Sequence, residues 1–370
     1  MNDPVDKSLH RIATIDWMRG IVMILMALDH ASGFFNQSRI FADSILLYES
    51  GSLFASDQFL TRWVTHICAP TFIFLTGASI AFTNAQRLRQ GIPQAVIDRE
   101  LRLRGIFIAM LDIVLLSLMS GKLVLQVLYA IGVGMIMMVW LRRLRISTVL
   151  IAAIVIVTGS ELLLRWIWIP GDHVPLWLAL TFAPVFSEVY SVLYPAIPWL
   201  AIMMSGWVWG EWILSKQPGP QCIQHLLFAC GGCAVLLFVL IRSIDGYGNM
   251  FMLLEGHSVI QWLHISKYPP SLAYILLELG LMAIMLAVLM RLEPVIGVHR
   301  NGPVLVFGQT ALFFYLTHFG VLVVLQLLFE RGGLEMAYFM ALLTLLILYP
   351  VCRIYRTVKW RNPAGLLRFM

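Results

Sequence analysis

The sequence predicts an all-α fold, a polytopic bundle of about ten transmembrane helices, and three observations support this prediction. The chain of 370 residues is 60% hydrophobic and only 12% charged, whereas soluble proteins carry about 25% charged residues. Its mean hydropathy is +0.83, and a soluble chain of this length could not bury so much apolar surface. Apolar windows of about 20 residues, long enough to cross a bilayer as helices, recur along the sequence.

The apolar windows follow one another with mostly short connections, and we treat residues 1–370 as a single transmembrane domain. The predicted spans lie approximately at residues 17–35, 63–84, 104–120, 123–141, 147–167, 192–213, 223–242, 270–290, 303–329 and 336–353. Three connections are long, namely 36–62, 168–191 and 243–269. Long loops often carry binding residues, so we expect a binding surface on the side of the membrane where these connections lie.

The basic residues predict the orientation of the spans. If the N-terminus is cytoplasmic, the inner connections hold most of the 26 Lys and Arg residues, with Lys7, Arg11 and Arg368 among them. The basic residues left on the outer side are Arg39, Arg62, Lys122, Arg165, Arg242, Lys267 and Arg331. Cytoplasmic loops are enriched in Lys and Arg, so we expect both termini in the cytoplasm. The first span lacks a small-residue cleavage site, so no cleavable signal peptide is predicted.

Composition and motifs argue against several classes of protein. Cys230 and Cys233 form a CxxC pattern inside an apolar run, where cysteines are typically small packing residues. The sequence contains no histidine pair with metal-ligand spacing, no P-loop, no nucleophile elbow and no dinucleotide-binding fingerprint. We therefore expect no metal site and no soluble-type nucleotide chemistry. The net charge of +6 gives no reason to expect nucleic acid as a partner.

The first predicted span organises the candidate site because it is apolar in the middle and charged at both ends. Asp16 and Arg19 lie at its start, and Asp29 and His30 lie at its end. At about 1.5 Å per residue, Asp16 and His30 are roughly 21 Å apart. Ionisable groups at membrane depth are costly and usually functional, and histidine suits proton transfer near neutral pH. Asp29 and His30 are therefore catalytic candidates, the alternative being two polar residues that merely end a helix.

The start of the second predicted span adds His66 as a third catalytic candidate. Pro70 follows four residues later and predicts a kinked helix or a freed backbone carbonyl. A kinked helix beside a histidine often lines a cavity, although a proline is also tolerated in the first turns of a helix. Arg62 lies on the same outer side and is a candidate for substrate binding.

Other candidates for substrate binding lie at the outer ends of later spans. Arg242 and Asp245 follow the seventh span, and Lys267, Tyr268 and Ser271 precede the eighth. These side chains suit a polar or anionic substrate group. The simpler alternative for Lys267 is a lysine that extends its amine to the lipid headgroups.

His318 lies inside the ninth predicted span and is too deep to be a solvent-exposed residue. We expect it in the outer half of the membrane, together with His30 and His66. The alternative is a buried histidine that is satisfied by a backbone carbonyl. Asp112 and Glu278 also lie at depth, and we expect them to belong to structural networks.

Seven segments, in order along nearly the whole chain, form a recognisable set. They are RIATIDWMRGIVMILMALDH, RWVTHICAPTFIFLTGAS, LYAIG, YPAIPWLAIMMSGWVWG, KYPPSLAYILLELG, GQTALFFYLTHF and YPVCRIYRTVKWRN. In this order they resemble bacterial membrane proteins related to heparan-α-glucosaminide N-acetyltransferase. The resemblance implies a transmembrane acyltransferase fold, cytosolic acetyl-CoA or another acyl-CoA as the donor, and a sugar on the far side of the membrane as the acceptor.

The resemblance also implies roles for the catalytic candidates. His30 matches the position of a catalytic asparagine in the animal enzyme, whose catalytic histidine follows in the next loop. Residues 31–65 contain no histidine, so the histidine function falls to His30 or His66. His30 would act as a general base or a transient acyl carrier, with Asp29 orienting it. His66 and His318 would supply a second base or donors to an oxyanion.

The remaining candidates fall into two groups. The outer group, which would hold a glycan or a lipid-linked sugar, consists of Arg62, Arg242, Asp245, Lys267, Tyr268, Ser271 and His318. The inner group, which would attract the phosphates of CoA, consists of Arg102 and Arg104. The implied location is a bacterial inner membrane, where the lipid bilayer surrounds the protein. Both a monomer and a homodimer are compatible with the sequence.

Two other functions use the same residues. A transporter or flippase for a lipid or glycan would use the intramembrane charges as substrate or proton sites, although the sequence has no internal repeat of the kind that many transporters carry. A non-catalytic membrane subunit would use these charges only for packing.

Overall fold

The structure is a computed structural model that describes residues 4–256 and 258–361, with side chains from Ala13 onward. Its helices in chain order are α1 (Pro4–Phe35), α2 (Ser56–Val64), α3 (Cys68–Arg89), α4 (Gln94–Ser120), α5 (Val127–Leu141), α6 (Ile146–Ile167), α7 (Leu176–Thr181), α8 (Ala196–Lys216), α9 (Pro220–Ile244), α10 (Val259–Leu263), α11 (Leu272–Ile296), α12 (Pro303–Gln309), α13 (Ala311–Leu328) and α14 (Leu334–Arg361). A short 3₁₀-helix, η1 (Thr65–Ile67), joins α2 to α3. The predicted all-α class is therefore confirmed.

Eight helical segments of the described chain are long and apolar enough to cross a membrane. The protein is thus a multi-pass membrane protein. The two predicted spans that do not correspond to one of these segments are α5, which has 15 residues, and α8, much of which is buried inside the bundle.

Two predicted spans differ from the observed helices. The span at 123–141 begins with strand β1 (Leu123–Leu125) before α5, because a short apolar run suits a strand as well as a helix. The span at 303–329 is interrupted at Thr310, where α12 ends and α13 begins. A window of hydropathy cannot detect this break, since the sequence remains apolar through it.

The strands form a small sheet in the order β1, β3 (Tyr190–Val192) and β2 (Val185–Phe186). Strand β1 runs parallel to β3, with Leu123 opposite Tyr190, and β2 runs antiparallel to β3. The sheet therefore fastens the connection between α7 and α8 to the turn between α4 and α5.

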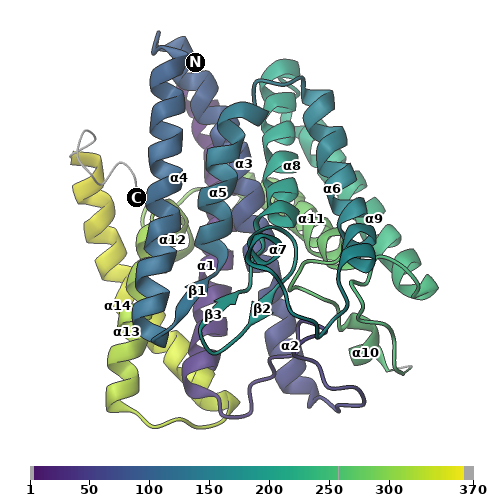
Figure 1. Cartoon of the computed structure of the whole chain (residues 1–370). Coiled ribbons are helices and arrows are strands. Elements are labelled where there is room, and N and C mark those ends of the chain that lie inside the picture. The colour runs from purple at the N-terminus through teal and green to yellow at the C-terminus, as the bar shows by residue number, and fades with distance from the viewer. Residues whose placement is uncertain (1–3, 257, 362–370) are drawn as a thin grey trace.

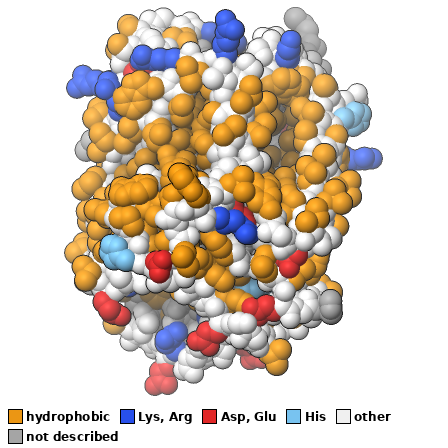
Figure 2. Space-filling model, turned by 45° about the vertical axis from the view of Figure 1, so that its right-hand side comes forward, with side chains coloured by type: hydrophobic (Ala, Val, Ile, Leu, Met, Phe, Trp, Pro, Cys, Tyr) orange, Lys and Arg blue, Asp and Glu red, His pale blue; other side chains and the backbone are white. Residues whose placement is uncertain are grey.

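The two ends of the bundle differ in charge. In Figure 1, α14 ends toward the upper side, whereas α2, α10 and the strands lie in the lower half. Figure 2 shows a broad hydrophobic band, with Lys and Arg side chains mostly above it and Asp and Glu side chains mostly below. This distribution agrees with a cytoplasmic upper end, although the orientation remains a prediction. The side chains of Lys7, Arg11 and Arg368, which contribute to that prediction, lie outside the described residues.

Glycines allow two pairs of helices to approach closely. A Cβ on Gly308 in α12 would lie 1.8 Å from the carbonyl oxygen of Asp16 in α1. A Cβ on Gly206 in α8 would lie 1.9 Å from the carbonyl oxygen of Phe74 in α3. Small residues at such crossings let helix backbones touch in a membrane. The α1–α12 and α3–α8 contacts therefore set the positions of the helices that surround the site described below.

We predict that Gly206→Ala destabilises the bundle because the added methyl group overlaps backbone that cannot move aside. Overpacking of this kind costs about 1–3 kcal/mol. The measurement is the temperature at which half of the detergent-solubilised protein ceases to elute as a single species. Gly320→Ala in α13 is the matched control, since nothing lies within 4 Å of its added Cβ. Equal midpoints for the two variants would contradict the prediction.

Candidate functional site

A cavity of about 840 Å³ runs along α1. Arg19, Met23, Met26 and His30 of α1 line it, and their spacing of three or four residues puts them on one face of the helix. At about 1.5 Å per residue, Arg19 and His30 are about 16 Å apart along the axis. The cavity therefore extends over about half of a hydrocarbon core of 30 Å.

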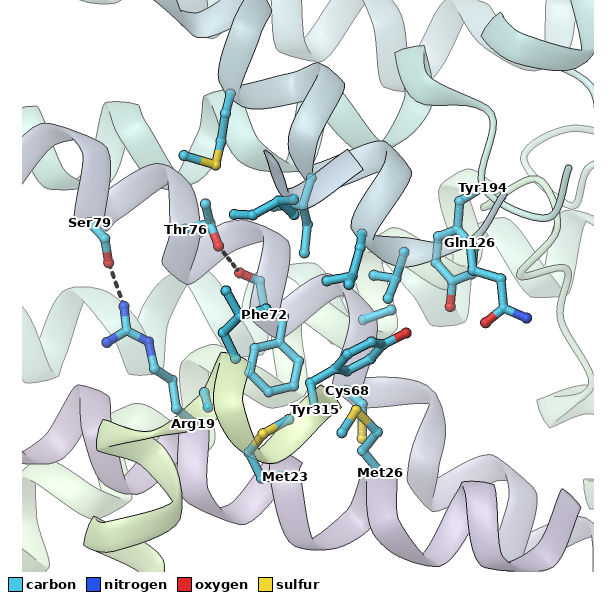
Figure 3. Close-up of a pocket in the computed structure, with 18 of the residues that line it drawn as sticks. Arg19, Met23, Met26, Cys68, Phe72, Thr76, Ser79, Gln126, Tyr194 and Tyr315 are labelled. Atoms are coloured by element: carbon cyan, nitrogen blue, oxygen red, sulfur yellow. Dashed lines mark hydrogen bonds between the residues drawn. The ribbon is translucent and has the colours of Figure 1, made fainter. Parts of the chain in front are cut away.

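The middle of the cavity is mostly apolar (Figure 3). Its lining there includes Met23, Met26, Cys68, Phe72 and Tyr315. Figure 3 shows Arg19, which is hydrogen-bonded to Ser79, on one side of this group, and Tyr194 and Gln126 on the other. An apolar passage thus connects two polar ends.

One polar end, called here the Arg104 end, is strongly basic. Its cationic residues are Arg19, Arg87, Arg104, Arg142 and Lys359. Arg19, Arg87 and Arg142 each form an ion pair with a carboxylate, but none of the described residues forms an ion pair with Arg104. Lys359 interacts electrostatically with Arg104, Arg19 and Asp16. This end therefore carries positive charge that an anionic ligand would neutralise.

The opposite end, called here the His30 end, is a network of ion pairs. Its charged and histidine residues that line the cavity are Asp29, His30, Arg39, Arg62 and Lys267. Arg62 donates from Nη1 to Oδ1 of Asp29 at 2.5 Å, and Arg39 donates from Nη2 to the same oxygen at 3.1 Å. Thr65 adds a third bond to this oxygen at 3.1 Å. Asp29 is thus held by two cations and a hydroxyl, rather than by its chain neighbour His30.

Asp43, which the sequence reasoning did not single out, is the second carboxylate of this network. It accepts two bonds from Arg62, one of them from Nε at 2.8 Å, and one from Nε2 of His66 at 3.2 Å. Burial alone would raise the pKa of the Asp43 carboxyl, but Arg62 and His66 lower that pKa well below its usual range. Asp43 is therefore an anion at neutral pH. Asp43 lies in a loop without hydrophobic periodicity, and no residue close to it in the sequence indicates a partner. The sequence therefore contains no signal that would have identified it.

His30 and His318 form a hydrogen-bonded pair. Nδ1 of His318 lies 3.1 Å from the carbonyl oxygen of Phe314, and a carbonyl only accepts, so this nitrogen carries a proton. Nε2 of a neutral His318 is then an acceptor, and it lies 2.6 Å from Nδ1 of His30. His30 must donate from Nδ1, which leaves Nε2 of a neutral His30 as a free lone pair. His30 lines the cavity, whereas His318 is fully buried behind it.

His66 lies behind the cavity wall rather than in it. It is 2% exposed, and its Nδ1 has no hydrogen-bond partner among the described residues. The carbonyl oxygen of His66 accepts a bond from Tyr274 at 2.9 Å, as expected for a carbonyl freed by Pro70 four residues later. The backbone at this point forms the 3₁₀-helix η1 instead of a continuous α-helix. His66 thus bonds to Asp43 and is not among the residues that line the cavity.

Three further candidates have structural partners away from the cavity. Arg242 donates all its N–H groups, four of them to carbonyls of the 250–264 region and one to Asn249. Asp245 accepts from the backbone of Leu254, and Ser271 caps the start of α11. None of the three lines the cavity. A sequence cannot distinguish an arginine that braces a loop from one that binds a ligand.

Three of the four remaining predicted residues line the cavity, and one does not. Lys267 and Tyr268 line the His30 end, and Arg104 lines the opposite end. Arg102, two residues away on α4, is exposed and does not line the cavity. Among the described residues, no group of three or more His, Cys, Asp or Glu side chains could hold a metal ion. The site therefore offers a histidine base, fixed cations and an apolar passage.

Comparison with known families assigns the chain. Residues 11–240 match the family described as heparan-alpha-glucosaminide N-acetyltransferase, catalytic. The match includes α1 with His30, the loop with Asp43, and Arg104. No protein with a curated description matches the chain. Since the matched region is more than half of the 370 residues, this multi-pass membrane protein belongs to the family of the catalytic region of heparan-α-glucosaminide N-acetyltransferase.

Proposed function

We propose that the protein transfers an acetyl group from acetyl-CoA to a hydroxyl or amine of a sugar or glycan. The observation that carries this proposal is the free Nε2 of His30 at one end of a cavity whose other end is basic. Membership of an acetyltransferase family supports the same reaction class. In this proposal the described residues supply the base and the binding groups, and acetyl-CoA is a co-substrate rather than a resident cofactor.

The Arg104 end is the proposed site for the phosphates of the donor. Arg104 lines it without forming an ion pair with any described carboxylate, and Lys359 lines it near Arg104. Phosphates form strong charge-assisted bonds with such groups. The apolar passage past Met23, Phe72 and Tyr315 then suits the uncharged pantetheine arm and its thioester. We therefore orient the donor with its nucleotide at Arg104 and its acetyl group toward His30.

The proposed chemistry takes place at the His30 end. Nε2 of His30 removes a proton from the acceptor hydroxyl or amine as that atom attacks the thioester carbonyl carbon. A new C–O or C–N bond forms, the C–S bond breaks, and the thiolate of CoA leaves and takes up the proton. Donation from Nδ1 to His318 holds the imidazole in the required tautomer. The alternative order, in which His30 first accepts the acetyl group itself, uses the same lone pair.

The proposed setting is a bacterial inner membrane with both termini in the cytoplasm. The donor would enter from the cytoplasmic side at the Arg104 end, and the acceptor would bind from the outer side. The greater number of basic residues on the side where α14 ends supports this orientation.

A transporter is the second candidate function because polar and charged residues line both ends of the cavity, as they would along a substrate pathway. A transporter would move a sugar or lipid unchanged, whereas an acetyltransferase consumes acetyl-CoA. The purified protein is therefore incubated with radiolabelled acetyl-CoA and crude glycans, and free CoA and labelled glycan are both measured. We expect the amount of CoA released to equal the amount of label that is incorporated into glycan. Absence of both would reject the enzyme proposal.

We predict that His30→Ala lowers acetyl transfer by about 10²–10⁴-fold, the usual contribution of a general base. His225→Ala is the matched control, since His225 is exposed on α9 and does not line the cavity. Labelled glycan is measured for both variants at equal amounts of monodisperse protein. Full activity of the His30→Ala variant would show that another residue is the base.

We also predict that Arg104→Ala raises the KM for acetyl-CoA by about tenfold, the effect of losing one charge-assisted contact of about 1.4 kcal/mol. The value of kcat should change little because Arg104 lies at the end of the cavity away from His30. Arg102→Ala is a close control, since it removes the same charge from the same helix outside the cavity. Equal KM values for the two variants would place the donor elsewhere.

A further inference from the structure

Lys267 is a buried cation at the His30 end of the cavity. Its side chain belongs to a residue that is 3% exposed and lines the cavity. The closest aromatic contact of its amine is the ring of Tyr268, with Nζ 5.5 Å from the centroid. Among the described residues, none forms an ion pair or a side-chain hydrogen bond with this amine.

Two carboxylates near Lys267 are already ion-paired with arginines. Arg39 and Arg62 are compensated by Asp29 and Asp43, which accept their bonds. Lys267 is left as the additional cation. Asp29, Asp43 and the buried Glu278 of α11 all interact with it electrostatically, but no ion pair joins Lys267 to any of them. The His30 end thus carries one positive charge more than its ion pairs use.

The position of Lys267 is held by its backbone. The N–H groups of Lys267 and Tyr268 both donate to the carbonyl oxygen of Asp43, at 2.9 and 3.1 Å. The same Asp43 binds Arg62 through its side chain. An amine that is placed this firmly in a low-dielectric region is costly without a counter-ion, so its retention indicates a ligand that brings a negative charge.

We propose that Lys267 binds an anionic group, a carboxylate or phosphate, of the acceptor molecule. This inference rests on the proposed function and names the class of acceptor, a sugar with one negative charge near the hydroxyl or amine that is acetylated. Tyr268 and Tyr194 offer aromatic surface for the sugar ring. Both line the cavity, and the centroids of their rings are 5.4 Å apart. The cavity of about 840 Å³ is within the usual range of 300–1,000 Å³ for ligand sites.

The test measures binding separately from turnover. The full-length protein in detergent is titrated with glucose, glucuronate, glucose 6-phosphate and, in the micelles, a polyprenyl-phosphate glucose. We expect the charged sugars to bind at least about tenfold more tightly than glucose, a difference of one charge-assisted contact. A preference for the polyprenyl compound over both soluble anions identifies a lipid-linked acceptor, and the reverse identifies a soluble one.

Substitution of Lys267 then locates the effect. Lys267→Met should remove the preference for charged sugars and leave glucose binding within about twofold, whereas Lys267→Arg should retain most of the preference. Lys122→Met is the control, since Lys122 bonds to Ser187 and does not line the cavity. Equal binding of glucose and the anionic sugars by the unsubstituted protein overturns the inference, and this comparison needs no variant.

The outcome for the proposed function is read independently. Charge-selective binding without any release of CoA from acetyl-CoA would retain the anion site and reject the acetyltransferase. Release of CoA with glucose and glucuronate as equally good acceptors, unaffected by Lys267→Met, would retain the acetyltransferase and reject the anion site. Equal loss of kcat with both sugars in Lys267→Met would assign Lys267 to the thioester carbonyl and also reject the anion site.

Discussion

The His30 end of the cavity depends on the ion pairs that the guanidinium of Arg62 forms with two carboxylates. Arg62 bonds to Asp29 at the end of α1 and to Asp43 in the following loop. Asp43 in turn holds His66 through its side chain and the Lys267–Tyr268 backbone through its carbonyl oxygen. Replacing both partners of a buried ion pair by apolar residues often leaves stability unchanged, but removing one partner leaves an uncompensated charge that is strongly destabilising. Arg62 therefore specifies the geometry of this end of the cavity.

In the proposed mechanism, the three histidines have different roles because their surroundings differ. His30 lines the cavity and has a free nitrogen, His318 fixes the tautomer of His30, and His66 bonds to Asp43. Only His30 combines access with an unbonded lone pair. In the proposed mechanism the proton transfer therefore takes place at His30, while His318 and His66 orient groups around it.

Sequence reasoning predicted the membrane bundle and named several residues that line the two polar ends of the cavity, because hydropathy and charge are visible in local composition. The charges at the two ends of α1 were visible, and so was the carbonyl that Pro70 frees. The break at Thr310 was not predictable, since it lies within an apolar run. Asp43 and the bracing role of Arg242 were also missed, because their partners are distant in the chain or are backbone groups. Patterns of residue type reveal depth and charge, but not which polar groups are already satisfied by neighbours.

In the proposed function, an acetyl group passes from a donor on one side of the membrane to an acceptor on the other. Sealed proteoliposomes with trapped glucuronate, given labelled acetyl-CoA only outside, test it most directly. We expect labelled glucuronate inside the vesicles and an equal amount of free CoA outside. Glucuronate that leaves the vesicles unmodified while acetyl-CoA stays intact would contradict the account and indicate a transporter.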